Sequence, residues 1–252
     1  MHKTTRIVAW CVALLFGGTS VAQAQMPAWT GKGFATFSIG LQAGSQEFTE
    51  TATPVIYGES ALITVPHSVD GGMLIDFSGG ARVWRNFGVG LGYSRTSSSE
   101  APTLTALIPN PAVFNSPRAA SASTGDLEHI ESAIHLELLW MLPITNEFEI
   151  AAIFGPSFYN ITQDMVGNVG ITEGSPPFGS VTISSVEVLR QSERATGFTL
   201  GMDATYLLTP QYGIGGFMRF SSAEADMETA GGGTVTVSAG GFQLGVGARV
   251  RF

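Results

Sequence analysis

The sequence predicts an all-β fold: an eight-stranded antiparallel transmembrane β-barrel with short periplasmic turns and long extracellular loops. Three observations lead to this prediction. Charged residues make up only 13% of the 252 residues, about half the share of roughly 25% that soluble domains carry. Apolar residues recur at every second position in eight segments, and the connections between these segments alternate between short and long.

The first 24 residues have the pattern of a cleaved signal peptide. A basic start containing Lys3 and Arg6 precedes an unbroken apolar run over 7–16 and small residues at 22–24, which is the order found in secretory signals. The apolar run is too short to cross a membrane as a helix, which needs about 20 apolar residues. We therefore expect residues 1–24 to be a signal peptide and residues 25–252 to form the exported barrel.

The remaining chain is acidic and free of cysteine. Removing residues 1–24 takes away Lys3, Arg6 and Cys11, so 10 basic and 20 acidic residues remain, a formal charge of −10. Disulfides, cysteine metal ligands and cysteine nucleophiles are excluded. Nucleic acid is not expected as a partner, because binding phosphates requires clustered Lys and Arg.

Eight segments show the period of two that is typical of a β-strand with two unlike faces. In the segment that ends the chain, Phe242, Leu244 and Val246 alternate with Gln243 and Gly245. The predicted strands are 37–42, 75–83, 87–94, 129–140, 148–154, 198–208, 212–220 and 242–252.

The connections between these strands set the topology. Three are tight, at 85–86, 143–147 and 209–211, and four are long, at about 44–72, 97–126, 165–194 and 222–238. The long connections are rich in Ser, Thr, Gly, Pro and acidic residues, as loops are. Short turns at one end, long loops at the other and apolar bands on one face are typical of outer-membrane barrels. The alternation at 181–186 and 234–237 suggests that some hairpins continue above the membrane.

Aromatic residues gather at the strand ends next to the short turns. Such rings settle at the level of lipid headgroups. The predicted girdle consists of Trp84, Phe87, Trp140, Phe148, Tyr206 and Tyr212. A soluble β-sandwich is the alternative, since its strands alternate equally well, but glycine runs occupy the face that a sandwich fills with Lys and Glu. A ten-stranded barrel stays open if part of a long loop enters the wall.

The chain resembles the small outer-membrane β-barrel family of Gram-negative bacteria, the OmpA/OmpX-like superfamily. The resemblance is carried by the hairpin at 80–93, which contains Trp84-Arg85-Asn86-Phe87, and by the terminal Val250-Arg251-Phe252. It covers essentially all of residues 25–252. The resemblance implies that Phe252 is the assembly signal read by the barrel assembly machinery. It implies no cell-wall anchor, because no peptidoglycan-binding domain follows the barrel.

Charged residues on the inward face predict a network inside the lumen, since charge in a membrane protein must be paired. Counting from the tight turns puts Arg82, Glu149 and Arg249 in one layer, and Glu137, Asp203 and Arg219 in a second near the middle. The full predicted network is Asp76, Arg82, Glu131, His135, Glu137, Glu149, Asp203, Arg219, Arg249 and Arg251. Such a network acts either as a salt-bridged plug or as a gate for ions.

The histidines offer little support for catalysis or metal binding. Six residues along one strand separate His129 from His135 by about 20 Å, so one metal cannot bind both. His67-Ser68-Val69-Asp70 contains the residue types of a hydrolase, but adjacency in sequence does not create a triad. We predict no enzyme activity, no metal and no cofactor.

These observations predict a monomeric protein of the cell outer membrane with a structural or surface-interaction role. Its expected partners are outer-membrane lipids, lipopolysaccharide and the barrel assembly machinery. The alternative is a narrow, porin-like channel for ions or small apolar solutes. A hydrolase at the outer rim is a third possibility.

Overall fold

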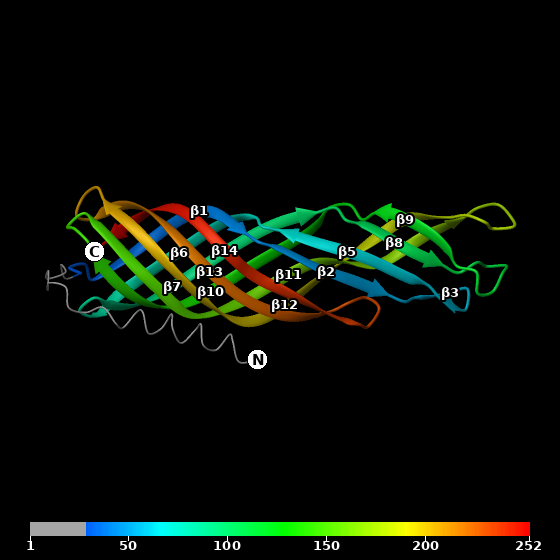
Figure 1. The fold of residues 1–252 in the computed structure, drawn as a ribbon, viewed down its shortest axis with the longest axis horizontal. Coiled ribbons are helices and arrows are strands. Elements are labelled where there is room, and N and C mark those ends of the chain that lie inside the picture. The colour runs from blue at the N-terminus through cyan, green and yellow to red at the C-terminus, as the bar shows by residue number, and fades with distance from the viewer. Residues whose placement is uncertain (1–28) are drawn as a thin grey trace, which may run out of the picture.

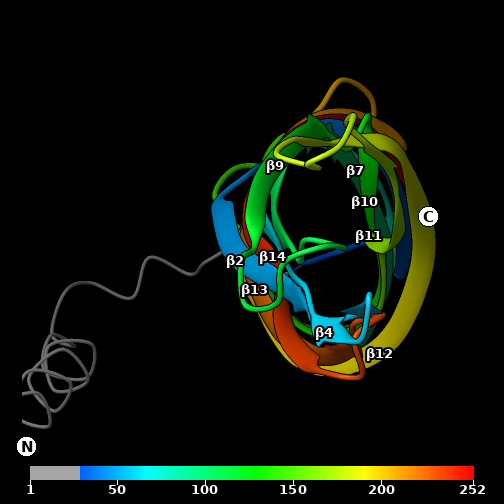
Figure 2. The same cartoon turned by 90° about the vertical axis from the view of Figure 1, so that its right-hand side faces the viewer.

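A computed structural model describes residues 29–252, so the predicted signal peptide lies outside the described residues. Eight antiparallel strands form a closed ring in the order β1-β14-β13-β12-β11-β10-β7-β6 (Figures 1 and 2). Their bounds are β1 Gly33–Ala43, β6 Met73–Trp84, β7 Phe87–Glu100, β10 Leu127–Pro143, β11 Phe148–Glu173, β12 Val181–Leu207, β13 Tyr212–Glu228 and β14 Thr234–Arg251. The ring confirms the eight-stranded prediction and excludes the sandwich and the ten-stranded barrel.

The ring closes where the first and last strands meet. β1 and β14 pair from Phe34↔Arg251 to Ala43↔Phe242. At the end of this seam, the backbone N–H groups of Lys32 and Gly33 donate to the carbonyl oxygen of Phe252 at 2.7 and 2.9 Å. The wall has no unpaired edge, which is the condition for a sheet to cross hydrocarbon.

The outer face of the ring is apolar because each strand keeps its period of two. Leu41 on β1, Leu138 on β10 and Val246 on β14 are 61–66% exposed, whereas the neighbouring Gln42 and Glu137 are buried. At the short-turn end, the rings of Trp84, Phe87 and Trp140 follow one another with centroids 6.1 Å apart. Tyr206 and Tyr212 are exposed at the same end and Phe148 is half-buried.

The predicted long loops are largely ordered strands, which corrects their assignment as loops. β11 and β12 have 26 and 27 residues, so their hairpin covers most of 165–194. The connections 44–72 and 97–126 contain a four-stranded sheet in the order β2-β5-β8-β9. Its strands are β2 Ser45–Ala52, β5 Leu62–Asp70, β8 Thr103–Ile108 and β9 Arg118–Ser123, and β3 Val55–Ile56 pairs with β4 Glu59–Ser60 at the tip.

The four-stranded sheet packs against the upper part of the β11–β12 hairpin. Ile63, Val65 and Leu104 from the sheet share a buried apolar cluster with Val166 and Val181 from the hairpin. We call this two-layered region, formed by residues 44–72, 97–126 and 164–194, the outer extension; it lies to the right in Figure 1. Burial of these apolar side chains stabilises the outer extension as a folded unit, which a polar loop could not form. The alternation predicted at 181–186 and 234–237 is confirmed as strand.

Two clusters of buried apolar side chains lie inside the barrel. At the short-turn end, Trp29, Phe34 and Met141 form an apolar cluster with Leu139 and Ala151. Towards the long-loop end, Tyr159, Ile161 and Met227 form a second cluster with surrounding alanines. The charged residues lie between and beside these clusters. Within residues 29–252, no helix has the length and apolar character needed to cross a membrane.

Candidate functional site

The central group of the lumen is built around Arg219 on β13. Its Nη2 donates to Asp76 Oδ2 on β6 at 2.5 Å, and its Nη1 lies 3.9 Å from Glu137 Oε1 on β10. Asp76 and Glu137 belong to the two strands that flank β7, and β7 lies opposite β13 in the ring. The guanidinium also lies 4.7 Å from the centre of the Phe217 ring. Arg219 is 4% exposed, so it makes these contacts across the barrel away from bulk solvent.

A second group lies nearer the short turns and contains Arg249 and Arg251 on β14. Arg249 Nη2 donates to Asp203 Oδ2 at 2.7 Å, and its Nη1 lies 3.7 Å from Glu149 Oε1. Arg251 Nη1 reaches the other oxygen of Glu149 at 3.2 Å. Arg249 also stacks over Phe34 at 4.0 Å and donates through Nε to a threonine of β1.

Two of the predicted layer assignments differ from the structure. Asp203 pairs with Arg249 and not with Arg219, although Arg219 is in register with Gly201, only two residues from Asp203 along β12. Arg82 is exposed at the rim of the short-turn end, where its guanidinium donates to the carbonyl oxygen of Trp29. The pairing of β6 with β7 is irregular between Arg82 and Trp84, and Arg82 joins neither Glu149 nor Arg249.

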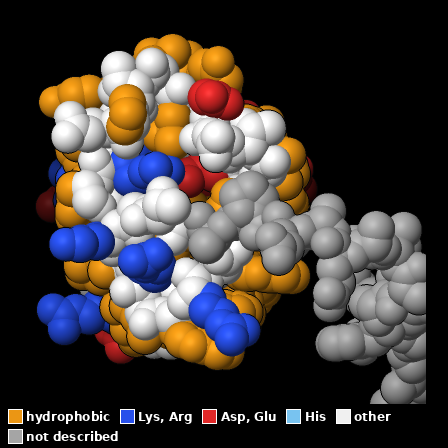
Figure 3. Space-filling model, turned by 90° about the vertical axis from the view of Figure 1, so that its left-hand side faces the viewer, with side chains coloured by type: hydrophobic (Ala, Val, Ile, Leu, Met, Phe, Trp, Pro, Cys, Tyr) orange, Lys and Arg blue, Asp and Glu red, His pale blue; other side chains and the backbone are white. Residues whose placement is uncertain are grey.

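The basic residues at this rim are visible in Figure 3, which views the molecule from the short-turn end. Lys32, Arg82 and Arg85 are exposed there. Trp29, whose carbonyl oxygen accepts from Arg82, is 1% exposed and packs inside this end of the barrel against Phe34. Trp29 could not be predicted as a lumen residue from the sequence, because a single aromatic residue before the first strand carries no periodic signal.

Further polar residues line the lumen on the long-loop side of Arg219. His135 is fully buried between two hydroxyl groups, with Nε2 2.9 Å from Ser94 Oγ and Nδ1 2.7 Å from Ser157 Oγ. Glu131 contacts His129 Nε2 at 3.0 Å and accepts hydrogen bonds from Gln42 Nε2 and the Gly240 backbone. The predicted network members His135 and Glu131 therefore lie in the lumen but outside the two arginine groups.

Glycine makes room for Glu137. A Cβ atom at Gly90 would lie 3.1 Å from Glu137 Oε2, and one at Gly92 would lie 3.3 Å from Glu137 Oε1. Gly90 is the register partner of Glu137 on the neighbouring strand β7. The glycines at 90 and 92 therefore accommodate a long side chain from the adjacent strand β10.

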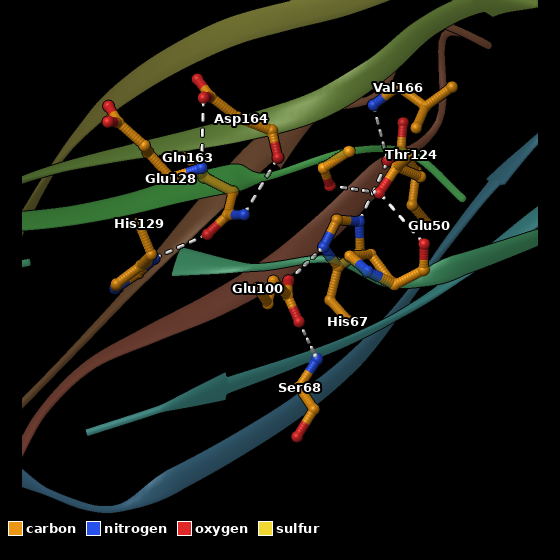
Figure 4. Close-up of polar contacts among 12 residues, drawn as sticks. Glu50, His67, Ser68, Glu100, Thr124, Glu128, His129, Gln163, Asp164 and Val166 are labelled. Atoms are coloured by element: carbon orange, nitrogen blue, oxygen red, sulfur yellow. Dashed lines mark hydrogen bonds and ion pairs between the residues drawn. The ribbon is translucent and has the colours of Figure 1, made fainter. Parts of the chain in front are cut away.

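A separate polar cluster lies at the base of the outer extension, around His67 on β5. His67 Nδ1 is 2.7 Å from Glu100 Oε1, and His67 Nε2 is 3.2 Å from Glu50 Oε2 (Figure 4). Glu50 Oε2 also accepts the Val166 backbone N–H at 3.1 Å. The cluster therefore joins β2, β5, the end of β7 and β11. The ring of His67 stacks on Phe48, with centroids 4.4 Å apart.

The charges of this cluster support one another. Burial lowers the pKa of His67, but the hydrogen bonds to Glu100 and Glu50 and their negative charge outweigh this effect, so the pKa is raised above 6.5. Burial raises the pKa of Glu100, yet its bonds to His67 and to the Ser68 N–H leave it below 4.5. Opposite charges in contact each favour the ionised form of the other.

This geometry does not form a hydrolase triad. Both nitrogens of His67 are bonded to carboxylates, and Ser68 contributes only its backbone N–H, to Glu100 Oε2 at 2.6 Å. Asp70 is exposed. His129 Nδ1 is bonded to Gln163 Oε1 at 2.6 Å. No three His, Cys, Asp or Glu side chains within residues 29–252 are grouped so that they could hold a metal ion.

Comparison with protein families identifies the barrel. Residues 11–252 match the family model described as an outer membrane protein beta-barrel domain. The chain belongs to this family. Membership places the barrel in the outer membrane, with short turns on the periplasmic side and the outer extension on the outside. A search of curated proteins found no match.

Several solved outer-membrane barrels are similar to this one. Ail, the attachment invasion locus protein of Yersinia pestis, is 11% identical with a TM-score of 0.38, and the match covers 88% of this chain and 99% of Ail. Neisserial surface protein A is 15% identical with a TM-score of 0.42, and the match covers 90% of this chain and 99% of that protein. The outer membrane protease OmpT of Escherichia coli is 9% identical with a TM-score of 0.47, and the match covers 92% of this chain and 100% of OmpT. None of these likenesses carries an argument about function.

Proposed function

We propose that this protein is a non-enzymatic structural barrel of the outer membrane, with a closed lumen and an outer extension that serves surface interaction. The observation that carries the proposal is the pairing of Arg219 and Arg249, which are 4% and 2% exposed, with carboxylates of other strands. Removing one partner of such a pair leaves an uncompensated buried charge. The pairs therefore hold the wall together from the inside and resist the entry of solutes.

Apolar side chains on both sides of these pairs support a closed lumen. Trp29, Phe34 and Met141 occupy the periplasmic end, and Tyr159, Ile161 and Met227 lie towards the outside. An ion that crosses the barrel would have to displace both clusters as well as the charge pairs. Water and ions enter an apolar, well-packed interior only at a large free-energy cost.

The proposed partners of the barrel are inferred from its exposed surfaces. Outer-membrane lipids and lipopolysaccharide would contact the apolar band and the base of the outer extension, and the barrel would be a monomer. The resemblance to small outer-membrane barrels makes Phe252 the proposed signal for the barrel assembly machinery. Its side chain is 69% exposed at the end of the β1–β14 seam and is accessible to a partner.

Single-channel recording in planar lipid bilayers tests the closed lumen. We expect no steady openings from the purified barrel at neutral pH. Incorporation is verified by the protease protection of the reconstituted protein, so that silence is not mistaken for failure to insert. Steady openings of uniform conductance would contradict the proposal.

A narrow channel for ions or small apolar solutes is the second candidate. The observation that favours it is the distance of 3.9 Å between Arg219 Nη1 and Glu137 Oε1, which exceeds a hydrogen bond and leaves this pair able to rearrange. A channel predicts openings that disappear in Arg219→Gln or Glu137→Gln. A rim hydrolase predicts lipid or peptide hydrolysis that His67→Ala or His129→Ala abolishes.

A further inference from the structure

The outer extension contains a cavity of about 220 Å³ beside Glu50. Strands β2, β5 and β11 and the turn between β13 and β14 surround it. A cavity of about 150 Å³ lined by apolar side chains holds a benzene ring, so this cavity has room for a small organic molecule. None of the residues that line it is a lysine or an arginine.

The floor of the cavity combines apolar side chains with one carboxylate. Ile63, Val65 and Val166 are buried there, at 4%, 1% and 3% exposure. Glu50 is 1% exposed, and its Oε1 is buried without a hydrogen-bond partner. A buried carboxylate oxygen without a donor is costly, so the arrangement favours a ligand that supplies one.

The entrance to the cavity lies at the protein surface, between the end of β2, the register shift in β11 and the turn between β13 and β14. Thr53, Asn168 and Ala230 are exposed at its edge. The turn after β13 forms the opposite wall, where a Cβ atom at Gly231 would lie 3.0 Å from Ala52 Cα. The pairing of β11 with β12 shifts between Val166 and Asn168, next to the Val166 N–H that donates to Glu50 Oε2. Bulges commonly re-aim groups at functional sites.

The electrostatics select a cation. Glu50, His67 and Glu100 carry a net charge of −1 even when His67 is protonated, because two carboxylates share one imidazolium. The Glu50 oxygen that lacks a partner is on the side of the carboxylate not used by His67 or Val166. A primary ammonium brings three N–H donors and a positive charge.

We propose that this cavity, the Glu50 pocket, binds a small primary alkylammonium. The ammonium donates to Glu50 Oε1, and the short alkyl chain packs against Ile63, Val65 and Val166. An alcohol of the same length leaves the negative charge without a counterion, and a quaternary ammonium has no N–H to donate. The pocket therefore ranks butylammonium above 1-butanol and tetramethylammonium. The inference goes beyond the structural role proposed above and does not depend on it.

Isothermal titration of the purified full barrel in detergent micelles with butylammonium at pH 7 tests the proposal. We expect saturable binding of one butylammonium per barrel. Glu50→Gln should weaken it by about 10- to 100-fold, since a charged hydrogen bond in a dry site is lost. The matched control is Glu47→Gln on the same strand, where the side chain is exposed; it should change the affinity by no more than about twofold.

A second variant keeps the test decisive if Glu50→Gln does not fold. Ala52→Leu retains Glu50 but fills the pocket, and it should abolish binding of butylammonium while the circular dichroism of the barrel is unchanged. Absence of saturable binding to the unmodified barrel would overturn the proposal and mean that water alone meets Glu50 Oε1. Equal losses in Glu47→Gln and Glu50→Gln, or full binding by folded Ala52→Leu, would also overturn it.

Discussion

At the scale of the residue, Arg219 makes the clearest energetic prediction. Arg219→Met leaves Asp76 and Glu137 buried without a cation, and we expect the free energy of unfolding to fall by about 3–5 kcal/mol. Reversible urea unfolding in lipid vesicles, followed by tryptophan fluorescence, measures this change. The control is Arg194→Met, at an exposed position on β12; its unfolding midpoint should hardly move.

A rescue experiment separates charge from packing. If unpaired charge causes the loss, adding Asp76→Asn and Glu137→Gln to Arg219→Met should restore part of the stability, since neutral polar groups are cheaper to bury than charges. A triple variant less stable than Arg219→Met would mean that the lost packing of Arg219 against Phe217 dominates.

The period of two predicted which side chains point inward, but not which of them meet. Asp76, Glu137 and Arg219 were placed in the lumen from alternation alone. Their pairing depends on the stagger of strands around a closed ring, which a single sequence does not reveal. The same stagger places Asp203 beside Arg249, and the irregular end of β6 leaves Arg82 on the rim.

At the scale of the element, the His67 cluster predicts how the outer extension depends on pH. The pKa of His67 is higher in the folded protein than the value of about 6.5 expected in the unfolded chain. Protonated His67 therefore stabilises the fold fully below about pH 6.5, and this stabilisation is lost as the pH rises through the pKa of the folded state. The lowered pKa of Glu100 contributes stability that is present above about 4.5 and is lost as pH falls. The outer extension should therefore be most stable between about pH 4.5 and 6.5.

Amide hydrogen exchange of β2 and β5 measures this dependence, after correction for the intrinsic effect of pH on exchange. Protection should decline from pH 6 to pH 8.5 in the unmodified barrel. In His67→Gln the decline on the alkaline side should disappear, while strands of the membrane wall keep their protection. An unchanged alkaline decline in His67→Gln would assign the effect to another group.

Arg118 predicts a local effect at the tip of the outer extension. Its Nη1 and Nη2 atoms both donate to the Glu173 carboxylate, and they also donate to the carbonyl oxygens of Phe178 and Pro109. Arg118 therefore connects β9 to the end of β11. Arg118→Ala should raise amide exchange around residues 173–181 by about tenfold or more. Exchange in β10 should not change, and the control Arg194→Ala, at an exposed position on β12, should leave both regions unaffected.

The outer extension was not predicted as a unit because its sheet is assembled from separate connections. β5 pairs with β8 only over residues 62–64 and 105–107, and the apolar side chains that cover it come from β11 and β12. Each connection alone is short of apolar residues and rich in turn formers. The alternation at 181–186 is visible in the sequence because it is local, whereas the sheet depends on contacts between distant segments.

At the scale of the whole molecule, the two apolar clusters inside the barrel predict that no single charge controls the lumen. Arg219→Met should remain silent in planar bilayers, because the clusters around Trp29 and around Tyr159 still close both ends. Conductance measured on this variant checks the prediction against the unmodified barrel. New openings in Arg219→Met would show that the arginine alone blocks an otherwise continuous path.

The overall fold was the most predictable property, because lipid imposes strict conditions on any β-structure that crosses it. Strand number, the positions of the short turns and the apolar outer face could be predicted from alternation and spacing. The plug formed by Trp29 could not, since its position depends on where the chain turns into the mouth before Gly33.

The seam between β1 and β14 has a consequence for how the protein is made. The strand synthesised first finds its final neighbour only in the strand synthesised last. A chain that stops short of residue 242 leaves β1 and β13 each with a row of unmatched amide groups facing the bilayer. Insertion is therefore expected to be all-or-none, with any shortened product left outside the membrane for proteases to remove.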